Sequence, residues 1–199
     1  MKQPQKRLSA EERRKIILKS AVKVFGRSNY RAAKMADIGA ESGVSEAMVY
    51  KHFPSKKAIF SRILQHISDR IIIIWEAETE KNLNALSTLK NMGLAYYHRM
   101  KDHPDELKVQ FQAISEIDDE DIASQLRQDH IRYIEYFESI LKKGVREGSI
   151  RPDIDSRVYA FLLNGSGITL NMMQLLALNI EFIDNHIDQF LDQYIELIA

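Results

Sequence analysis

The stretch that decides the fold of this chain is Met35–Phe53, which reads MADIGAESGVSEAMVYKHF. Small and apolar residues at helical spacing open it, and a Glu-Ser-Gly turn follows at 41–43. Ser45 is a favoured N-cap for a second short helix over Glu46–Lys51. A short helix, a glycine turn and a second short helix are the parts of a helix-turn-helix. The sequence therefore predicts a second helix that fits the major groove of duplex DNA.

The composition is that of a globular chain without cysteine. Its 199 residues are 45% hydrophobic, which is enough for a buried core in one domain or two small ones. The absence of cysteine excludes disulfides and zinc–thiolate sites. The first residues are polar and basic, unlike a signal peptide, and the longest apolar run, Ile71–Trp75, is far too short to span a bilayer. We therefore expect a cytoplasmic protein with no membrane partner.

The net charge of zero conceals an asymmetry along the chain. Residues 1–60 contain 14 Lys and Arg against 5 Asp and Glu, whereas residues 61–199 contain 14 against 23. A basic first third suggests that this part meets a polyanion, although solvated surface charge can also divide in this way by chance. Because the helix-turn-helix lies inside the basic third, we favour DNA as the partner.

Five segments within residues 10–60 form a distinctive pattern: Phe25…Asn29-Tyr30, Ala36–Gly39, Ser42–Ser45, Val49–Phe53 and Ser55–Phe60. In order, spacing and residue type, these segments resemble the amino-terminal domain of TetR-family (TetR/AcrR) transcriptional regulators. The resemblance implies an all-α fold, with a three-helix DNA-binding domain at 9–54 and its motif at about 34–52. It further implies a larger helical domain at 55–199 for ligand binding and dimerisation. Three positions depart from the family: Lys34 replaces a threonine N-cap, Gly39 replaces alanine, and Asn29 stands where glycine is common.

The same resemblance identifies the residues that face DNA. Its groove-facing positions are Ser45, Glu46, Ala47, Met48, Tyr50 and Lys51, and its phosphate-facing positions are Tyr50, His52, Lys56, Lys34 and Met35. Glu46 can accept a hydrogen bond from a cytosine amino group, and Ala47 or Met48 can touch a thymine methyl group. Since one subunit reads one half-site, the operator of a dimer should be a palindrome.

Lys56 is also indicated by its place in a helix. Ser55 caps a long helix, so Lys56 and Lys57 fall in its first turn, where a cation opposes the helix dipole by roughly 0.3–1 kcal/mol. A nearby phosphate would turn this unfavourable placement into a contact. We therefore predict that Lys56 anchors the DNA backbone, with a solvated lysine as the alternative.

Beyond residue 55 the apolar periodicity predicts further helices, over about 86–101, 107–117, 119–147, 158–178 and 182–198. The acidic cluster Asp118–Asp121 precedes one of them and is better explained by the helix dipole than by a metal. Gly and Ser in 164–167 favour close helix packing. Following the family, we expect the last two helices to form a four-helix bundle with a second copy.

Methionine and aromatic residues at core spacing are candidates to line a ligand pocket, although each can equally be ordinary core. The candidates are Met92, Tyr96, Met100, Phe111, Ile114, His130, Tyr133, Phe137 and Met172. Their chemistry predicts a small hydrophobic or amphipathic ligand that acts as the inducer of a repressor.

Three other function classes compete with this interpretation. For an enzyme the sequence offers no glycine-rich phosphate loop, no nucleophile elbow and no paired histidine spacing, so we expect no catalytic residue, cofactor or metal. An activator or an architectural protein would differ from a repressor only in where its operator lies. A helical interaction module without DNA would lack salt-sensitive binding to duplexes.

Overall fold

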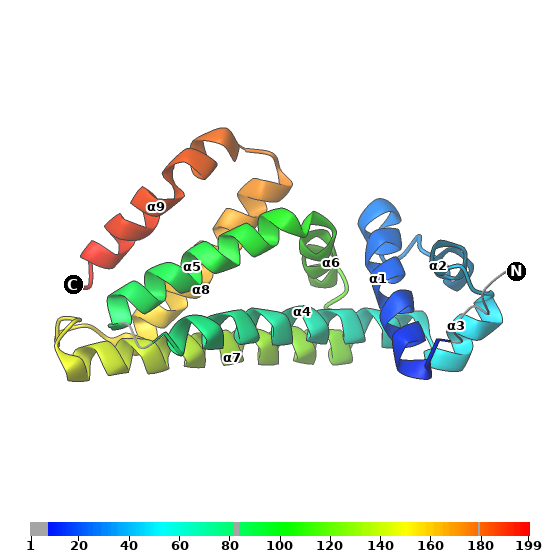
Figure 1. The fold of residues 1–199 in the computed structure, drawn as a ribbon, viewed down its shortest axis with the longest axis horizontal. Helices are drawn as coiled ribbons and strands as arrows, with labels where there is room; N and C mark the ends of the chain where they lie inside the picture. Colours follow the sequence, from blue (N-terminus) through cyan, green and yellow to red (C-terminus); the bar gives the residue numbers. More distant parts are fainter. Residues whose placement is uncertain (1–7, 82–83, 179) are drawn as a thin grey trace, which may run out of the picture.

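The computed structural model describes residues 8–81, 84–178 and 180–199, and within these ranges it is entirely helical, without strands, which confirms the all-α fold (Figure 1). The helices are α1 (Ala10–Ser28), α2 (Met35–Ser42), α3 (Glu46–His52), α4 (Lys56–Thr79), α5 (Ala85–Asp102), α6 (Pro104–Ile114), α7 (Glu120–Glu147), α8 (Ser156–Leu175) and α9 (Ile180–Glu196).

Side-chain caps fix where the amino-terminal helices begin. The Ser9 hydroxyl accepts from the Glu12 amide while the Glu12 carboxylate accepts from the Ser9 amide, a capping box that opens α1. Ser45 and Ser55 accept from Met48 and Ala58 in the same manner. These three starts therefore lie where the sequence predicts them.

The helix-turn-helix occupies one end of an elongated molecule. In Figure 1, α1, α2 and α3 gather around the beginning of α4, and the rest of α4 runs along α7 into the larger part of the chain. Phe25, Phe60 and Tyr30 join α1 to α4, with ring centroids 5.4 Å apart for Phe25–Phe60 and 4.4 Å apart for Tyr30–Phe60. The apolar core is continuous from this aromatic group to Trp75 and beyond.

The larger part is built on the pair α4 and α7, with α5, α6, α8 and α9 above it (Figure 1). The run Ile71–Trp75 is buried at Ile71, Ile72 and Trp75, whereas Ile73 is 53% exposed. The run is therefore buried on several sides, and Ile73 lies on the outer face of α4.

Several boundaries differ by two or three residues from the sequence prediction. α6 begins at Pro104 instead of Leu107, because proline fits the first turn of a helix. α8 ends at Leu175, three residues earlier than expected. The acidic cluster does lie at a helix start, where Asp119 caps α7 by accepting from the amides of Asp121 and Ile122.

Gly39 sets the distance between the two helices of the motif. A Cβ atom at this position would lie 2.9 Å from the Val44 carbonyl oxygen and 3.2 Å from the Glu46 amide nitrogen. Both are backbone atoms of the turn into α3, which cannot move without displacing that helix. The glycine therefore permits the close approach of α2 and α3 that the sequence suggests.

We predict that Gly39→Val lowers the free energy of unfolding by about 1–3 kcal/mol, because its side chain would be forced against that backbone. Thermal unfolding followed by circular dichroism measures the effect. Ala36→Val is the matched control, because it introduces the same residue at an exposed position of the same helix. Equal melting temperatures for the two variants would contradict the close-approach argument.

Candidate nucleic-acid interface and ligand cavity

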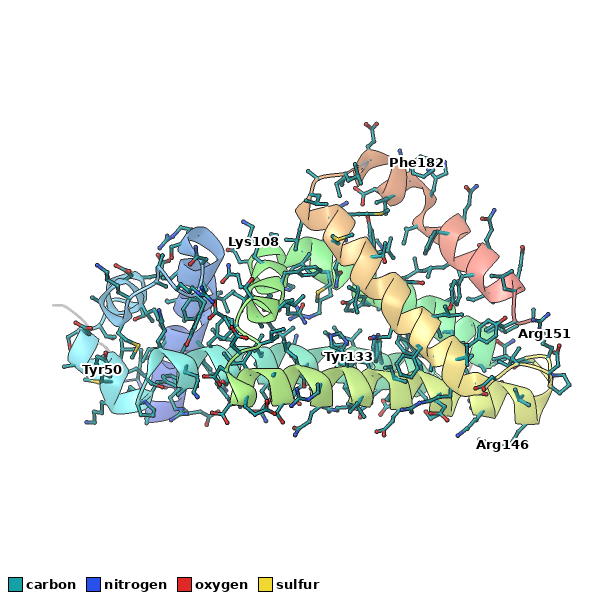
Figure 2. All side chains as sticks on the ribbon, turned by 180° about the vertical axis from the view of Figure 1, so that it is seen from behind. Tyr50, Lys108, Tyr133, Arg146, Arg151 and Phe182 are labelled. Carbon is teal, nitrogen blue, oxygen red and sulfur yellow. The ribbon has the colours of Figure 1, made fainter. Side chains whose placement is uncertain are left out.

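The exposed face of α3 carries most of the predicted DNA-facing residues. Val49 is fully buried and anchors the helix, while Tyr50 is 50% exposed. Ser45, Glu46, Ala47 and Lys51 are exposed as well, and Met48 and His52 are half-buried. Figure 2 places Tyr50 at the end of the molecule formed by the motif. The structure thus presents these residues together on one free surface.

The start of α2 agrees with the prediction only in part. Lys34 is exposed, and its backbone amide donates to the Asp37 carboxylate at 3.0 Å, which is the half of a capping box that needs no side-chain acceptor at the N-cap. Met35 is only 5% exposed and belongs to the apolar core. Its side chain therefore cannot face the DNA backbone as expected, because the turn of α2 directs it inward.

Lys56 is engaged within the protein. Its ammonium group donates to the carbonyl oxygens of Arg31 and Ala33 at 3.1 and 2.9 Å, and it lies 4.7 Å from the centroid of the Tyr30 ring. These contacts offset the dipole of α4 and hold the α1–α2 loop against it. A lysine has three N–H donors, so one remains for a phosphate.

His52 lies in a positive environment at the end of α3. Burial, together with the charges of Arg13, Arg14 and Lys51, holds its pKa below the usual value. Arg14 also donates to the His52 carbonyl oxygen at 3.0 Å and stacks over Phe53, 4.6 Å from the ring centroid. This edge of the motif is therefore electropositive, which suits an anion.

A cavity of about 240 Å³ lies inside the larger part, enclosed by α4, α5, α6, α7, α8 and α9. Seven of the nine predicted pocket residues line it: Met92, Tyr96, Phe111, Ile114, His130, Tyr133 and Phe137. Met100 is fully buried in the core without reaching the cavity, and Met172 is 46% exposed elsewhere on α8. Figure 2 shows Tyr133 on the base formed by α4 and α7, beneath α5 and α8.

The cavity also contains groups that sequence reasoning missed. Trp75 and Asp129 line it, as do Gln110, Asn171 and Tyr194 from three other helices. Burial raises the pKa of Asp129, and it raises the pKa of Tyr96 and of Tyr194 to about 12. Sequence reasoning could have found Asp129, because it is a polar residue on the inner face of a predicted amphipathic helix.

Helix α6 connects this cavity to the DNA-binding end. Gln110, Phe111 and Ile114 line the cavity, while the Gln112 amide donates to the Phe25 carbonyl oxygen of α1 at 2.9 Å. Just after α6, Glu116 pairs with Arg31 at 2.8 Å. Helix α6 and the segment after it therefore contact both the cavity and the DNA-binding end.

A second link joins the starts of α4 and α7. The Lys57 ammonium pairs with Asp119 at 3.0 Å and with Asp121 at 2.6 Å. These carboxylates raise the pKa of Lys57 and keep the pKa of Asp119 below its usual value. The acidic cluster therefore serves the helix and the adjacent lysine.

Residues 17–63 match the family model described as bacterial regulatory proteins, tetR family. The chain is a TetR-family transcriptional regulator. The repressor KstR2 of Mycobacterium tuberculosis is 21% identical to this regulator over 79% of the chain and 80% of its own length. Relatives of this family are transcriptional regulators and not enzymes.

Solved structures share the fold of this TetR-family regulator over nearly its full length. A protein from Saccharomonospora viridis, described as a transcriptional regulator and solved in complex with choline, has a TM-score of 0.79 at 26% identity, over 94% of this chain and 96% of its own. FadR from Bacillus subtilis, solved in complex with stearoyl-CoA, has a TM-score of 0.78 at 16% identity, over 92% and 96%. Among the described residues of the regulator, none of the helices is long and apolar enough to cross a membrane, and no group of three or more acidic or histidine side chains is placed to hold a metal.

We predict that Asp119→Ala lowers the melting temperature more than Asp121→Ala. Both substitutions remove a partner of Lys57, but only the first also removes the cap of α7. Differential scanning calorimetry of the two variants makes the comparison. A larger effect of Asp121→Ala would show that the ion pair outweighs the cap.

Proposed function

We propose that this regulator is a homodimeric repressor that binds a palindromic operator through α3 and is released by a small molecule bound in the cavity. The observation that carries the proposal is that α6 lines the cavity with one part of its surface and bonds to α1 with another. Residue 9 to residue 54 would form the DNA-binding domain, and residue 55 to residue 199 the ligand-binding and dimerisation domain.

DNA binding is supported by the exposed face of α3 and by the basic first third of the chain. Glu46, Ala47 and Met48 lie at the amino-terminal end of α3, the part of a recognition helix that reaches base edges. Tyr50, Lys51, His52, Lys34 and Lys56 would contact the phosphates. We assign sequence choice to the first group and overall affinity to the second.

Dimerisation is supported by the apolar surface of α8 and α9. Large apolar side chains there are 39–67% exposed in a single copy: Val158, Phe161, Leu162, Ile168, Met172, Leu176, Leu178, Phe182 and Phe190. A surface of this kind is typical of a protein–protein interface. A two-fold pairing of α8 and α9 would cover it and place two copies of α3 on one face of DNA.

A small-molecule effector is supported by the cavity itself and by the solved neighbours. Its lining is mostly apolar and aromatic with a few convergent polar groups, as in most ligand sites. The two neighbours described above were solved with choline and with stearoyl-CoA, which are chemically unlike each other. These two complexes therefore support the proposal that the cavity of this regulator binds a small molecule, but they do not indicate its chemical class.

DNA binding is tested by selecting bound duplexes from a random pool and measuring affinity by fluorescence anisotropy. We expect palindromic sequences and an affinity that falls with salt. Lys51→Ala should weaken binding to every duplex about tenfold and flatten its salt dependence, whereas Glu46→Gln should change the selected half-site. Arg146→Ala is the charge-matched control, because this exposed cation lies at the opposite end of the molecule (Figure 2).

A selection that returns no preferred duplex would remove the operator from the proposal. An equal loss of DNA affinity in Lys51→Ala and Arg146→Ala would show that net charge, and not the surface of α3, determines affinity.

We predict that Leu162→Glu converts the dimer into a monomer at low micromolar concentration, because an unpaired carboxylate would be buried between the subunits. Light scattering after size-exclusion chromatography gives the mass. Ile16→Glu is the matched control, because Ile16 is an exposed apolar residue on α1, and it should leave the dimer intact. A dimer that survives Leu162→Glu would place the interface elsewhere.

A further inference from the structure

The cavity wall contains one buried carboxylate, and among the described residues it has no ion-pair partner. Asp129 is only 9% exposed, and Gln125 donates to its Oδ1 atom at 2.9 Å. Among the residues that the structure describes, no lysine, arginine or histidine nitrogen lies within ion-pair distance of it, and the cavity lining includes neither lysine nor arginine. Arg132, on the same helix, pairs with Asp69 instead, at 2.8 Å.

An arrangement of this kind is unfavourable. A buried carboxylate loses its hydration, and here Gln125, the Ser68 hydroxyl and the charges of His130 and Arg132 replace only part of it. Burial therefore still raises the pKa of Asp129. A positively charged ligand would supply the missing partner.

Aromatic rings surround the same space. Trp75 lies with its ring centroid 4.6 Å from Phe137, 5.4 Å from Tyr133 and 6.1 Å from Tyr96, and all four residues line the cavity. The negative faces of such rings attract cations, above all alkylated ammonium groups that shed water easily. The rings and Asp129 therefore select for the same charge.

Three further polar atoms in the wall lack a partner. Trp75 Nε1, Gln110 Oε1 and the Tyr194 hydroxyl are buried without a hydrogen bond. Buried polar groups are normally satisfied, so these atoms indicate a ligand that also carries a polar end. A hydroxyl group would serve, since it both donates and accepts.

We propose that the cavity binds a small organic cation, an alkylated ammonium ion with a short hydroxyl-bearing tail, whose positive charge is balanced by Asp129 among the rings of Trp75, Tyr96, Tyr133 and Phe137. This assignment rests on the proposed function and specifies the class of its effector.

The principal competitor is an anionic amphiphile such as a fatty acid. A carboxylate in this cavity would meet Asp129 and find no lysine or arginine in the wall. Placing two like charges together in a space of low dielectric constant is strongly unfavourable. The charge of the wall therefore argues against this class, although the apolar surface would accept its chain.

The chain provides its own reporter for the test. Trp75 is its one tryptophan, so the intrinsic fluorescence of the full-length protein reports occupancy of the cavity. The first probe is the cation hydroxypropyl-trimethylammonium. The second is the neutral alcohol in which a tert-butyl group replaces the trimethylammonium group. The third is an anion with the same tert-butyl skeleton, in which a carboxylate replaces the hydroxyl end. The three differ chiefly in charge.

We expect the ammonium ion to bind at least about tenfold more tightly than the neutral alcohol, and the carboxylate to bind most weakly. Asp129→Asn, which keeps the shape of the side chain, should remove the preference for the cation without weakening the alcohol. Glu135→Gln, an exposed acid on the same helix, is the matched control and should retain it.

Equal binding of the cation and the alcohol, or an unchanged preference in Asp129→Asn, would overturn the proposal. Operator affinity is measured separately on the same samples. DNA binding without a preference for the cation would refute only the ligand class. Cation binding that leaves operator affinity unchanged would support the site and refute its role as an effector site.

Discussion

The continuity of α4 is the constraint on which the rest of the structure depends. This helix of 24 residues spans about 36 Å at its normal rise, and it belongs to both parts of the molecule. Near its start, Phe60 packs against Phe25 and Tyr30 of the DNA-binding end. Near its end, Trp75 forms part of the cavity wall. One continuous helix fixes these two places relative to each other.

Rigid attachment alone would leave the DNA-binding end unresponsive to the cavity. Helix α6 provides the second connection, since one of its faces lines the cavity while Gln112 reaches the end of α1. Gly26 of α1 also lies close to Asp105 of α6: a Cβ atom there would be 2.6 Å from the Asp105 carboxylate. In the proposed mechanism, a shift of α6 would therefore move α1, and α2 and α3 with it.

The DNA-binding end could be predicted from the sequence in detail because its signals are local. Caps at Ser9, Ser45 and Ser55, and the glycine turn at 43, are decided by a few neighbouring residues. Met35 was predicted to face DNA but is buried, because the direction of the first side chain of a short helix depends on the tertiary packing around it.

The cavity could be predicted only as a list of candidates. Periodicity identifies inner faces, which is how seven of the lining residues were found, but it cannot separate residues that fill a core from those that leave a space. Met100 and Met172 share the chemistry of the lining residues and differ only in tertiary position. The role of Lys57 was likewise invisible, because its partners Asp119 and Asp121 lie more than 60 positions away.

A ligand can shift an equilibrium only by binding two conformations with different affinity. Here the groups that would sense the ligand lie on different helices of the wall. Trp75 and Asp129 belong to the long paired helices α4 and α7, whereas Gln110 lies on α6, with its Oε1 atom unsatisfied. A ligand held by α4 and α7 and completed by Gln110 would favour one position of α6 over others. The cavity would thereby control the orientation of α1, since Gln112, on the same helix, is bonded to it.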